Sequence, residues 1–485
     1  MNRIVSLRAA SIAALVAGTA LTAAPAFARQ QGPVDLTATA QQAATDRQGE
    51  VEQAKPQQTK QAANAAPGDT APQPQATSVP VIQPIPGVTP PELQGPPPPP
   101  PHWSLGDAKQ LLAAIRGIGA EGLFPKDYEP TALAEAIAAG EGDALNATAT
   151  RLFSWLVEDL RDGRTPMDDR IQWFVFDPDA DNDPTSVVLA HALEMHDIKG
   201  ALTELDPTNP DYAALKAKLA ETKDPKTKAL IRINMDRWRW LPQDLGLQYL
   251  ITNVPEEMLR LTVNNKIITT YKTIVGKPGR TATPQLAETV QGVIFNPTWT
   301  VPQSIVKGEG LGARLLANPA SARRQGYKVT KSDSGMITVV QQPGANNALG
   351  LMKLDMPNQH AIFIHDTPNR NLFDQDNRAL SHGCIRTQRA TELGMTMAIL
   401  GADMSPEEGV EISTSGKYTR VPMSKTFPVY IVYFTYARDV NGDLHAFKDL
   451  YDRDPPVLES FAGPRPEHTG QRHSTQEVIV AQDPL

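Results

Sequence analysis

The chain has 485 residues, 43 prolines, 40% hydrophobic residues and a formal net charge of −8. This length allows two or three domains, and the proline content indicates that part of the chain is linker. The acidic balance argues against nucleic acid as a partner, because phosphate binding depends on clustered Lys and Arg.

The N-terminus carries the pattern of a cleaved secretory signal peptide. Arg3 and Arg8 precede an uncharged stretch rich in alanine and leucine, which ends in the small-x-small pattern Ala26-Phe27-Ala28. The alternative is a retained membrane helix, but the stretch is weakly apolar and contains Pro25. We therefore expect a signal peptide at residues 1–28, export to the periplasm, and no transmembrane segment in the mature chain.

Residues 29–101 are rich in Gln, Ala, Pro and Thr and end in a run of prolines. Such a composition buries too little apolar surface to offset the entropy that is lost on ordering. The proline run itself favours a stiff polyproline II spacer. We predict a disordered tether over this range.

Residues 102–230 have the pattern of a helical domain. Apolar residues recur with a 3.6-residue period over 105–115, with Ser104 as the candidate N-cap. A second such stripe runs through 145–160, and a third helix is expected over 212–222. We interpret these stripes as core faces rather than as ligand sites.

From residue 231 the sequence alternates apolar and polar residues in the manner of strands. Strands are expected at 259–263, through 274–275, and at 290–295, 361–364 and 429–436. A hairpin turn is expected at Asn441-Gly442 and a helix at about 388–400. Long helices do not alternate with these strands, so the fold class is α+β, with a β-rich domain over 231–460, rather than a doubly wound parallel sheet. Residues 461–485 are predicted to be a disordered tail.

Cys384 is the only cysteine in the chain. A single cysteine excludes an intramolecular disulfide, and in an exported protein it is a candidate reactive thiol. The alternative is a buried cysteine that acts as a small hydrophobic residue. A catalytic thiolate needs a histidine within hydrogen-bond reach and N–H donors for the oxyanion that develops.

His365 fits the role of the base for Cys384. It follows the apolar segment 361–364 and would leave the end of a strand in a fixed direction, and the polar loop 366–380 can fold back to bring the cysteine beside it. Asp366, through its backbone carbonyl or its side chain, is the nearest group that could orient the base. His382, two residues before the cysteine, is assigned a supporting hydrogen-bonding role.

The residues next to Cys384 provide a turn. Gly383 permits a positive φ or a close approach of the backbone, so a tight turn there would aim the N–H of Cys384 at the oxyanion. Arg386 would share a side with Cys384 on a continuing strand, where it could bind a substrate carboxylate bidentately. The remaining histidines lack metal-ligand spacing, so we expect neither a metal nor another cofactor.

His365, a spacer and the run Ser381-His382-Gly383-Cys384-Ile385-Arg386 resemble the signature of the L,D-transpeptidase (YkuD) family. Further segments resemble the large YcbB-like subgroup of that family: "NMDRWRWLP" (234–242), "IVGKPGR" (274–280), "FNPTWTVPQSI" (295–305) and "PGANNALG" (343–350). The segments "GLFPKDY" (122–128) and "LVEDLRDGR" (156–164) resemble its scaffold domain. The resemblance covers roughly residues 102–460.

This resemblance implies a helical scaffold domain, a β-rich catalytic domain and a capping subdomain inserted at about 304–357. Cys384 would attack the bond after the third residue of a peptidoglycan stem peptide, usually meso-diaminopimelate, and release D-alanine. The side-chain amine of another diaminopimelate would resolve the thioester acyl-enzyme into a 3→3 cross-link. The resemblance also makes His365 the base, Asp366 the residue whose backbone carbonyl orients it, and the cysteine a target of carbapenems.

Two features depart from the family pattern. Phe363 occupies a position that often holds tyrosine in relatives, and phenylalanine cannot donate the hydrogen bond of that hydroxyl. Phe363, Ser381, His382 and Arg386 are the candidate substrate-binding residues. Only residues 215–230 separate the scaffold and catalytic regions, so we expect no peptidoglycan-binding module between them.

Two alternative functions stay open at this point. The first is an L,D-carboxypeptidase or amidase of the same family, which would use water as the acceptor and hydrolyse stem peptides or protein–wall links. The second is a non-catalytic wall-binding scaffold. The sequence also leaves open whether the acceptor is a stem peptide, an outer-membrane protein or a free D-amino acid.

Overall fold

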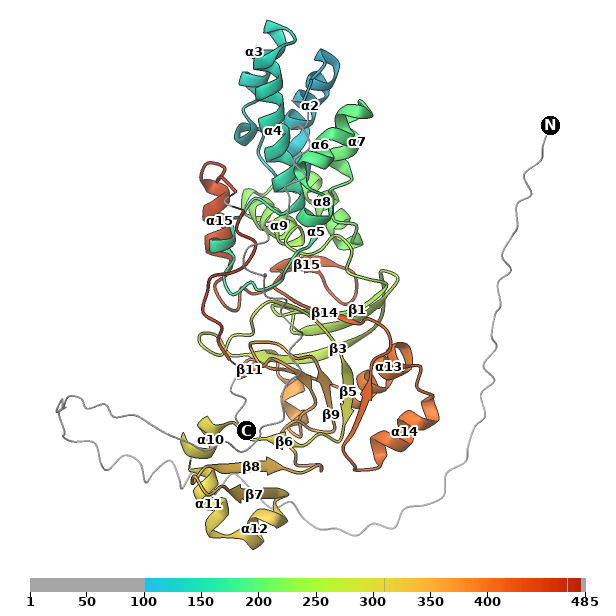
Figure 1. Ribbon diagram of the computed structural model, residues 1–485, viewed down its shortest axis with the longest axis vertical. Helices are drawn as coiled ribbons and strands as arrows, with labels where there is room; N and C mark the ends of the chain where they lie inside the picture. The colour runs from blue at the N-terminus through green and yellow to red at the C-terminus, as the bar shows by residue number, and fades with distance from the viewer. Residues whose placement is uncertain (1–100, 309, 469, 481–485) are drawn as a thin grey trace, which may run out of the picture. The chain divides into compact units, whose positions relative to one another are not determined.

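The computed structural model describes residues 101–308, 310–468 and 470–480 (Figure 1). The predicted signal peptide, and the predicted tether apart from its last residue, lie outside these ranges. The described residues belong to one unit by their contacts. None of the helices in these ranges combines the length and the apolar character that are needed to cross a membrane.

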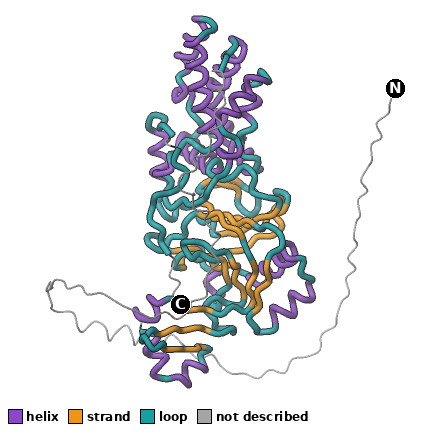
Figure 2. Tube along the Cα trace, in the orientation of Figure 1, coloured by secondary structure: helices purple, strands orange, loops and turns teal. Residues whose placement is uncertain are grey.

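The first part of the described chain is helical, as predicted (Figure 2). Its α-helices are α2 (Leu105–Gly117), α3 (Pro130–Ala139), α4 (Asp143–Arg161), α5 (Asp179–Asn182), α6 (Thr185–Glu194), α7 (Ile198–Thr203), α8 (Pro210–Glu221) and α9 (Pro225–Trp238). Short 3₁₀ turns lie at η1 (Ile118–Glu121), η2 (Pro125–Tyr128) and η3 (Met167–Asp169). The helical region therefore extends to residue 238, beyond the expected end at 230, because Asp224 caps α9 and Pro225 begins it.

The predicted helix starts and core faces are confirmed. The Ser104 hydroxyl accepts the Asp107 N–H at 3.1 Å, so it caps α2 as expected. The apolar stripe of α4 is buried from Leu145 to Leu160 and joins a hydrophobic cluster shared with α2, α8 and α9. Trp238 and Trp240 are buried in the same cluster.

The second part is built on a mixed sheet with the strand order β13-β5-β9-β10-β12-β3-β2-β1-β14-β4, and β11 pairs with β3. The strands are β1 (Gln248–Asn253), β2 (Met258–Val263), β3 (Lys266–Gly276), β4 (Leu286–Thr289), β5 (Gly292–Phe295), β9 (Met352–Asp355), β10 (Ile364–His365), β11 (Ala379–Ser381), β12 (Ile385–Thr387), β13 (Thr419–Pro422) and β14 (Pro428–Val432). Three pairs are parallel, β1 with β14, β10 with β12, and β11 with β3. The α+β class is therefore confirmed.

A second hydrophobic cluster lies between this sheet and the helix α13 (Ala390–Ala402), which packs against β5 and β9. Helix α14 (Pro406–Thr414) follows α13 and packs on it (Figure 1). The predicted helix at 388–400 is thus confirmed, with bounds shifted by two residues. Helix α13 covers the apolar face of β5 and β9. The polar side chains of the neighbouring strands therefore lie on the opposite face of the sheet.

Two predicted strands differ from the structure in length. The strand expected at 361–364 is short, because Ala361 has a positive φ of 52° and the Asn358 side chain bonds both backbone groups of Ile362. The strand expected at 429–436 is divided between β14 and β15 (Tyr436–Arg438). The predicted turn at Asn441-Gly442 does join a hairpin, in which β15 pairs with β16 (Leu444–Ala446).

A segment between β5 and β9 forms a small sheet of its own, in the order β6-β8-β7. Its elements are β6 (Trp299–Thr300), α10 (Gln303–Gly308), α11 (Leu311–Ala317), α12 (Pro319–Arg324), β7 (Tyr327–Lys331) and β8 (Ile337–Gln341). A separate hydrophobic cluster reaches from Trp299 to Leu349. The cap was expected at 304–357, but this unit begins with β6 at Trp299. It ends before β9, because β9 belongs to the main sheet.

The C-terminal segment differs from the expected disordered tail over 461–485. Helix α15 (Asp454–Ala462) covers its first residues, and the irregular chain that follows lies against the helical region. Arg465 donates to both carboxylate oxygens of Asp159 at 2.9 Å, and His468 Nε2 lies 2.9 Å from the same group. The paired residues are 306 and 309 positions apart in the sequence. Local composition therefore does not predict these contacts.

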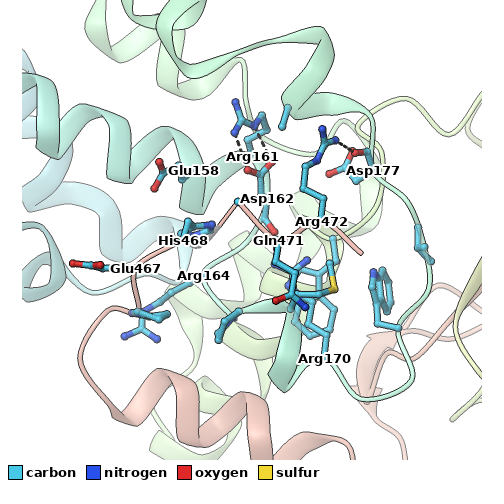
Figure 3. Close-up of a pocket in the computed structure, with 18 of the residues that line it drawn as sticks. Glu158, Arg161, Asp162, Arg164, Arg170, Asp177, Glu467, His468, Gln471 and Arg472 are labelled. Carbon is cyan, nitrogen blue, oxygen red and sulfur yellow. Dashed lines mark hydrogen bonds and ion pairs between the residues drawn. The ribbon is translucent and has the colours of Figure 1, made fainter. Parts of the chain in front are cut away.

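This segment also borders a cavity of about 260 Å³ beside the end of α4. Figure 3 shows its charged lining, with Arg472 beside Asp177 and with His468 and Asp162 nearby. Burial and the neighbouring Asp179 raise the pKa of Asp177 to about 7. Cys384 is not among the residues that line this cavity.

Candidate active site

Three neighbouring strands bring the predicted residues together. In the antiparallel pair β9–β10, His365 is opposite Lys353, and in the parallel pair β10–β12, His365 is opposite Arg386. Directly opposed residues project from the same face of a sheet. Lys353, His365 and Arg386 therefore form a row across the three strands.

Cys384 lies in the turn directly before β12, beside this row. Ile385 is opposite Ile364 and its N–H donates to the Phe363 carbonyl at 2.9 Å, so Cys384 stands opposite Phe363. Phe363 and Cys384 directly precede β10 and β12, two positions before His365 and Arg386. The backbone pairing of these two strands thus brings the turn that carries Cys384 beside the strand that carries His365.

His365 is held by the residue that follows it. Its Nδ1 lies 2.5 Å from the backbone carbonyl oxygen of Asp366, and both residues are fully buried. Because a carbonyl oxygen only accepts, this contact assigns the ring proton to Nδ1 and makes Nε2 the basic nitrogen. The geometry thus agrees with the backbone of Asp366 as the orienting group.

The side chain of Asp366 has a different task. Its Oδ2 accepts the Leu351 N–H at 2.9 Å and pairs with Arg370 at 2.8 Å. Gly350 has a φ of 62°, and a Cβ there would lie 2.4 Å from the Asp366 carboxylate. Asp366 therefore ties the chain before β9 to the loop after β10.

The turn before Cys384 is fixed by Ser381. The Ser381 hydroxyl donates to the Cys384 carbonyl at 2.6 Å and accepts the Gly383 N–H at 3.2 Å. Gly383 has a φ of 123°, which agrees with the positive φ that was expected at this glycine. His382 is half-buried in the same turn.

A layer that the sequence reading missed supports this turn from behind. The Thr283 hydroxyl donates to the Gly383 carbonyl at 2.8 Å and accepts the Gly276 N–H at 2.9 Å. The Tyr451 hydroxyl donates to the Gly276 carbonyl at 2.6 Å. Gly276 leaves no room for a side chain, because a Cβ would collide with the Thr281 carbonyl. The segment 274–280 was recognised in the sequence, but only as a point of resemblance.

The side chain of Cys384 is enclosed. Cys384 is 3% exposed, and its Sγ lies 3.6 Å from the Ala361 carbonyl oxygen. Arg386 is also buried. An enclosed site of this kind excludes bulk water from the thiol and strengthens the electrostatic effect of each nearby charge.

Lys353 is the second feature that the sequence reading missed. Its Nζ lies 3.4 Å from the centre of the Phe363 ring. Burial lowers the pKa of Lys353, while charge on Cys384 and on Asp355 acts in the opposite direction. The alternation of Met352 and Leu354, both buried, with Lys353 between them was the available signal.

In the ranges that the structure describes, no group of three or more His, Cys, Asp or Glu side chains is arranged to hold a metal ion.

Comparisons with known proteins find similarity in two parts of the chain. A family model for the L,D-transpeptidase (YkuD) catalytic domain matches residues 247–394, and a model for a scaffold domain matches residues 100–219. A Haemophilus influenzae protein whose name assigns it to the L,D-transpeptidases is 27% identical over 251 residues, which are 49% of this chain and 50% of that protein. The match thus spans half the length of that relative.

Solved structures of similar proteins were also found. An L,D-transpeptidase from Mycobacterium smegmatis is 13% identical, covers 38% of this chain and 58% of its own, and has a TM-score of 0.19. L,D-transpeptidase 1 from Mycobacterium tuberculosis is 13% identical, covers 38% of this chain and 61% of its own, and has a TM-score of 0.17.

Proposed function

We propose that this chain forms 3→3 cross-links between peptidoglycan stem peptides. The chain belongs to the YkuD family of L,D-transpeptidases and has a scaffold domain ahead of its catalytic domain. The observation that carries the proposal is the position of His365. It lies on β10, which pairs with β12 directly after Cys384, and its Nδ1 contacts the Asp366 carbonyl oxygen.

In the first half-reaction, Nε2 of His365 takes the thiol proton of Cys384, and the thiolate attacks the carbonyl carbon of the third stem residue. The tetrahedral oxyanion accepts hydrogen bonds from backbone N–H groups of the turn that Ser381 and Gly383 form. The C–N bond to D-alanine then breaks, and the imidazolium gives its proton to the leaving amine. A thioester on Cys384 and free D-alanine result.

In the second half-reaction, the side-chain amine of a diaminopimelate in another stem peptide attacks the thioester. His365 accepts a proton from this amine, the new amide forms, and the thiolate leaves. We assign Arg386 to a carboxylate of the peptide substrate, because it is a cation opposite His365 and two residues from the nucleophile. His382 and Phe363 are proposed to shape the adjoining surface.

The enclosed thiol supports synthesis over hydrolysis, because a site that excludes water protects a thioester from it. Hydrolysis to the tripeptide is the outcome expected of an L,D-carboxypeptidase. Neither product would form on a non-catalytic wall-binding scaffold. We further propose that the protein acts in the periplasm, where its stem-peptide substrates are, and that a stem peptide is the acceptor rather than an outer-membrane protein.

The test is to incubate the purified mature chain with a disaccharide-tetrapeptide and to identify the products by mass spectrometry. A 3→3 dimer is expected, and the matched variant Cys384→Ser should not form it. Tripeptide without dimer would replace the proposal with a carboxypeptidase. Absence of both products, together with no carbapenem adduct on Cys384, would overturn it.

A further inference from the structure

We propose that Lys353 is a positioning residue for the nucleophile: its ammonium group, held over the ring of Phe363, favours the thiolate form of Cys384. The inference rests on the proposed function in so far as that function requires a thiolate. It adds a cation to the pair of His365 and Cys384, and it gives a role to the phenylalanine that departs from the family pattern.

The sheet register places Lys353 where this effect is possible. Lys353 is directly opposite His365, and Phe363 precedes His365 by two residues. Ile385, the first residue of β12, donates its N–H to the Phe363 carbonyl, so the turn that carries Cys384 lies beside Phe363. Phe363 leads into β10, and β10 lies between β9, which carries Lys353, and β12, which follows Cys384.

The ammonium group of Lys353 contacts the aromatic ring of Phe363. At 3.4 Å from the ring centre, Nζ is in the range of a cation–π interaction, which holds the cation without neutralising it. A carboxylate partner would instead cancel most of the field that reaches the thiol. The nearest acid on the same strand, Asp355, is paired with Arg420 at 2.7 Å.

The remaining neighbours do not supply an opposing negative charge. On one side of Lys353, the opposite residue on β5 is Ile294, which is apolar. On the other side lie His365 and, beyond it, Arg386. The row therefore carries cationic or neutral groups, and a negative charge on Cys384 is the complementary state.

The electrostatic interaction between Lys353 and Cys384 is mutual. Charge on Cys384 raises the pKa of Lys353, in opposition to the larger lowering by burial. Coupling between two sites is reciprocal, so the ammonium group must favour the thiolate by the same free energy. The low dielectric of an enclosed site increases this coupling.

The fact that the chain has one cysteine makes the inference directly testable. The far-ultraviolet absorbance of the thiolate is followed against pH in the full mature chain, and the curve of Cys384→Ser is subtracted. This readout needs neither substrate nor access of a reagent to the thiol. Lys353→Met should raise the apparent thiol pKa by about one unit, so that about tenfold less thiolate is present below it.

Three further variants separate the charge from the fold. Lys353→Arg should titrate like the wild type, since it keeps the cation. Phe363→Leu should shift the titration in the same direction as Lys353→Met, because the ammonium group loses its support, and it carries the test if Lys353→Met does not fold. Lys331→Met, at an exposed lysine at the end of β7, is the matched control and should change nothing.

The inference is overturned if Lys353→Met and Phe363→Leu, both folded by thermal melt, titrate like the wild type. A rise in KM for the tetrapeptide with an unchanged titration would also overturn it, because Lys353 would then bind the substrate carboxylate. In either case the cross-linking activity of the wild type is tested independently of the role of Lys353. A wild-type enzyme without turnover would sink the proposed function, and the thiol titration would still report on Lys353.

Discussion

The imidazole Nδ1 of His365 and the backbone carbonyl oxygen of Asp366 lie 2.5 Å apart, in residues that are both fully buried. Because the acceptor belongs to the backbone, substitution of the neighbouring side chain leaves it in place. The orientation of the His365 ring is therefore coupled to the backbone conformation directly after β10.

Replacement of His365 should remove the base and leave the fold. His365→Gln should lower the rate of carbapenem acylation of Cys384 by about 10²–10⁴-fold, the usual contribution of a general base. The rate is measured by intact-protein mass spectrometry over a time course. Replacement of His382 by Gln is the matched control, with a loss below tenfold. Equal losses in the two variants would contradict the assignment of His365.

Asp366→Asn should have little effect on catalysis. The asparagine keeps the carbonyl that His365 uses and an oxygen for the Leu351 N–H, and it loses only the ion pair to Arg370, whose side chain is 54% exposed. Because the Asp366 carboxylate is buried and only Arg370 is exposed, the loss exceeds that of a fully exposed pair and should be about 1–3 kcal/mol. We expect kcat/KM within about threefold of the wild type and a loss of unfolding free energy of that size. A thousandfold loss of activity would show instead that the carboxylate itself orients the base.

Gly350→Ala should be more damaging to catalysis than Asp366→Asn. The residue has a positive φ, and its new Cβ would meet the Asp366 carboxylate at 2.4 Å. Strain at such a position typically costs about 1–3 kcal/mol. Urea denaturation should show this loss, and acylation should slow because Asp366 is displaced. Gly119→Ala is the control, because nothing lies within 4 Å of the added carbon and its φ is not positive. Similar stability of the two variants would be inconsistent with this view of Gly350.

The turn before the nucleophile should depend on Ser381. Ser381→Ala removes a hydroxyl that donates to the Cys384 carbonyl and accepts the Gly383 N–H, both in a buried site. Leaving such groups unpaired costs about 1–3 kcal/mol. We expect lower unfolding free energy and slower acylation together. Thr283→Val, which removes the second support of Gly383, should act in the same direction. Normal acylation in both variants would exclude a role for the turn geometry.

The C-terminal segment should add an acid-sensitive contribution to stability. Burial acts to raise the pKa of Asp159, but the hydrogen bond from His468 and the charge of Arg465 outweigh it, and the pKa is lowered. A lowered pKa in the folded state means that the contribution is present above the ordinary value near 3.8 and is lost as the pH falls through the lower folded-state value. Melting temperatures of wild type and Asp159→Asn should therefore converge on acidification. A gap that stays constant from neutral pH to pH values below 3.8 would contradict this.

Local patterns predicted most of the elements. The 3.6-residue stripe of α4, the cap at Ser104 and the helix after Cys384 depend on short-range preferences, and the structure has all three. The short β10 could not be foreseen, because it depends on the positive φ of Ala361 and on Asn358 side-chain bonds. The contacts of Arg465 with Asp159 join distant parts of the chain, which composition does not report.

The site shows the same division. The relation of His365, Gly383 and Cys384 could be inferred, since each chemical role demands a particular residue type near the others. Thr283 and Tyr451 could not, because they act through backbone groups of a turn far from them in the sequence. The proximity of Lys353 to the site could not be predicted either, because it depends on the strand register that places Lys353 opposite His365.

The most direct test of the central claim is the mass of the enzyme during turnover. The mature chain is mixed with tetrapeptide donor, quenched in acid after a short time, and measured intact. We predict a wild-type species heavier by the tripeptide acyl group, located on Cys384 by peptide mapping and lost when a stem-peptide amine is added, with a 3→3 dimer as product. Dimer formation by Cys384→Ser at the wild-type rate, or turnover without any adduct on Cys384, would contradict the account.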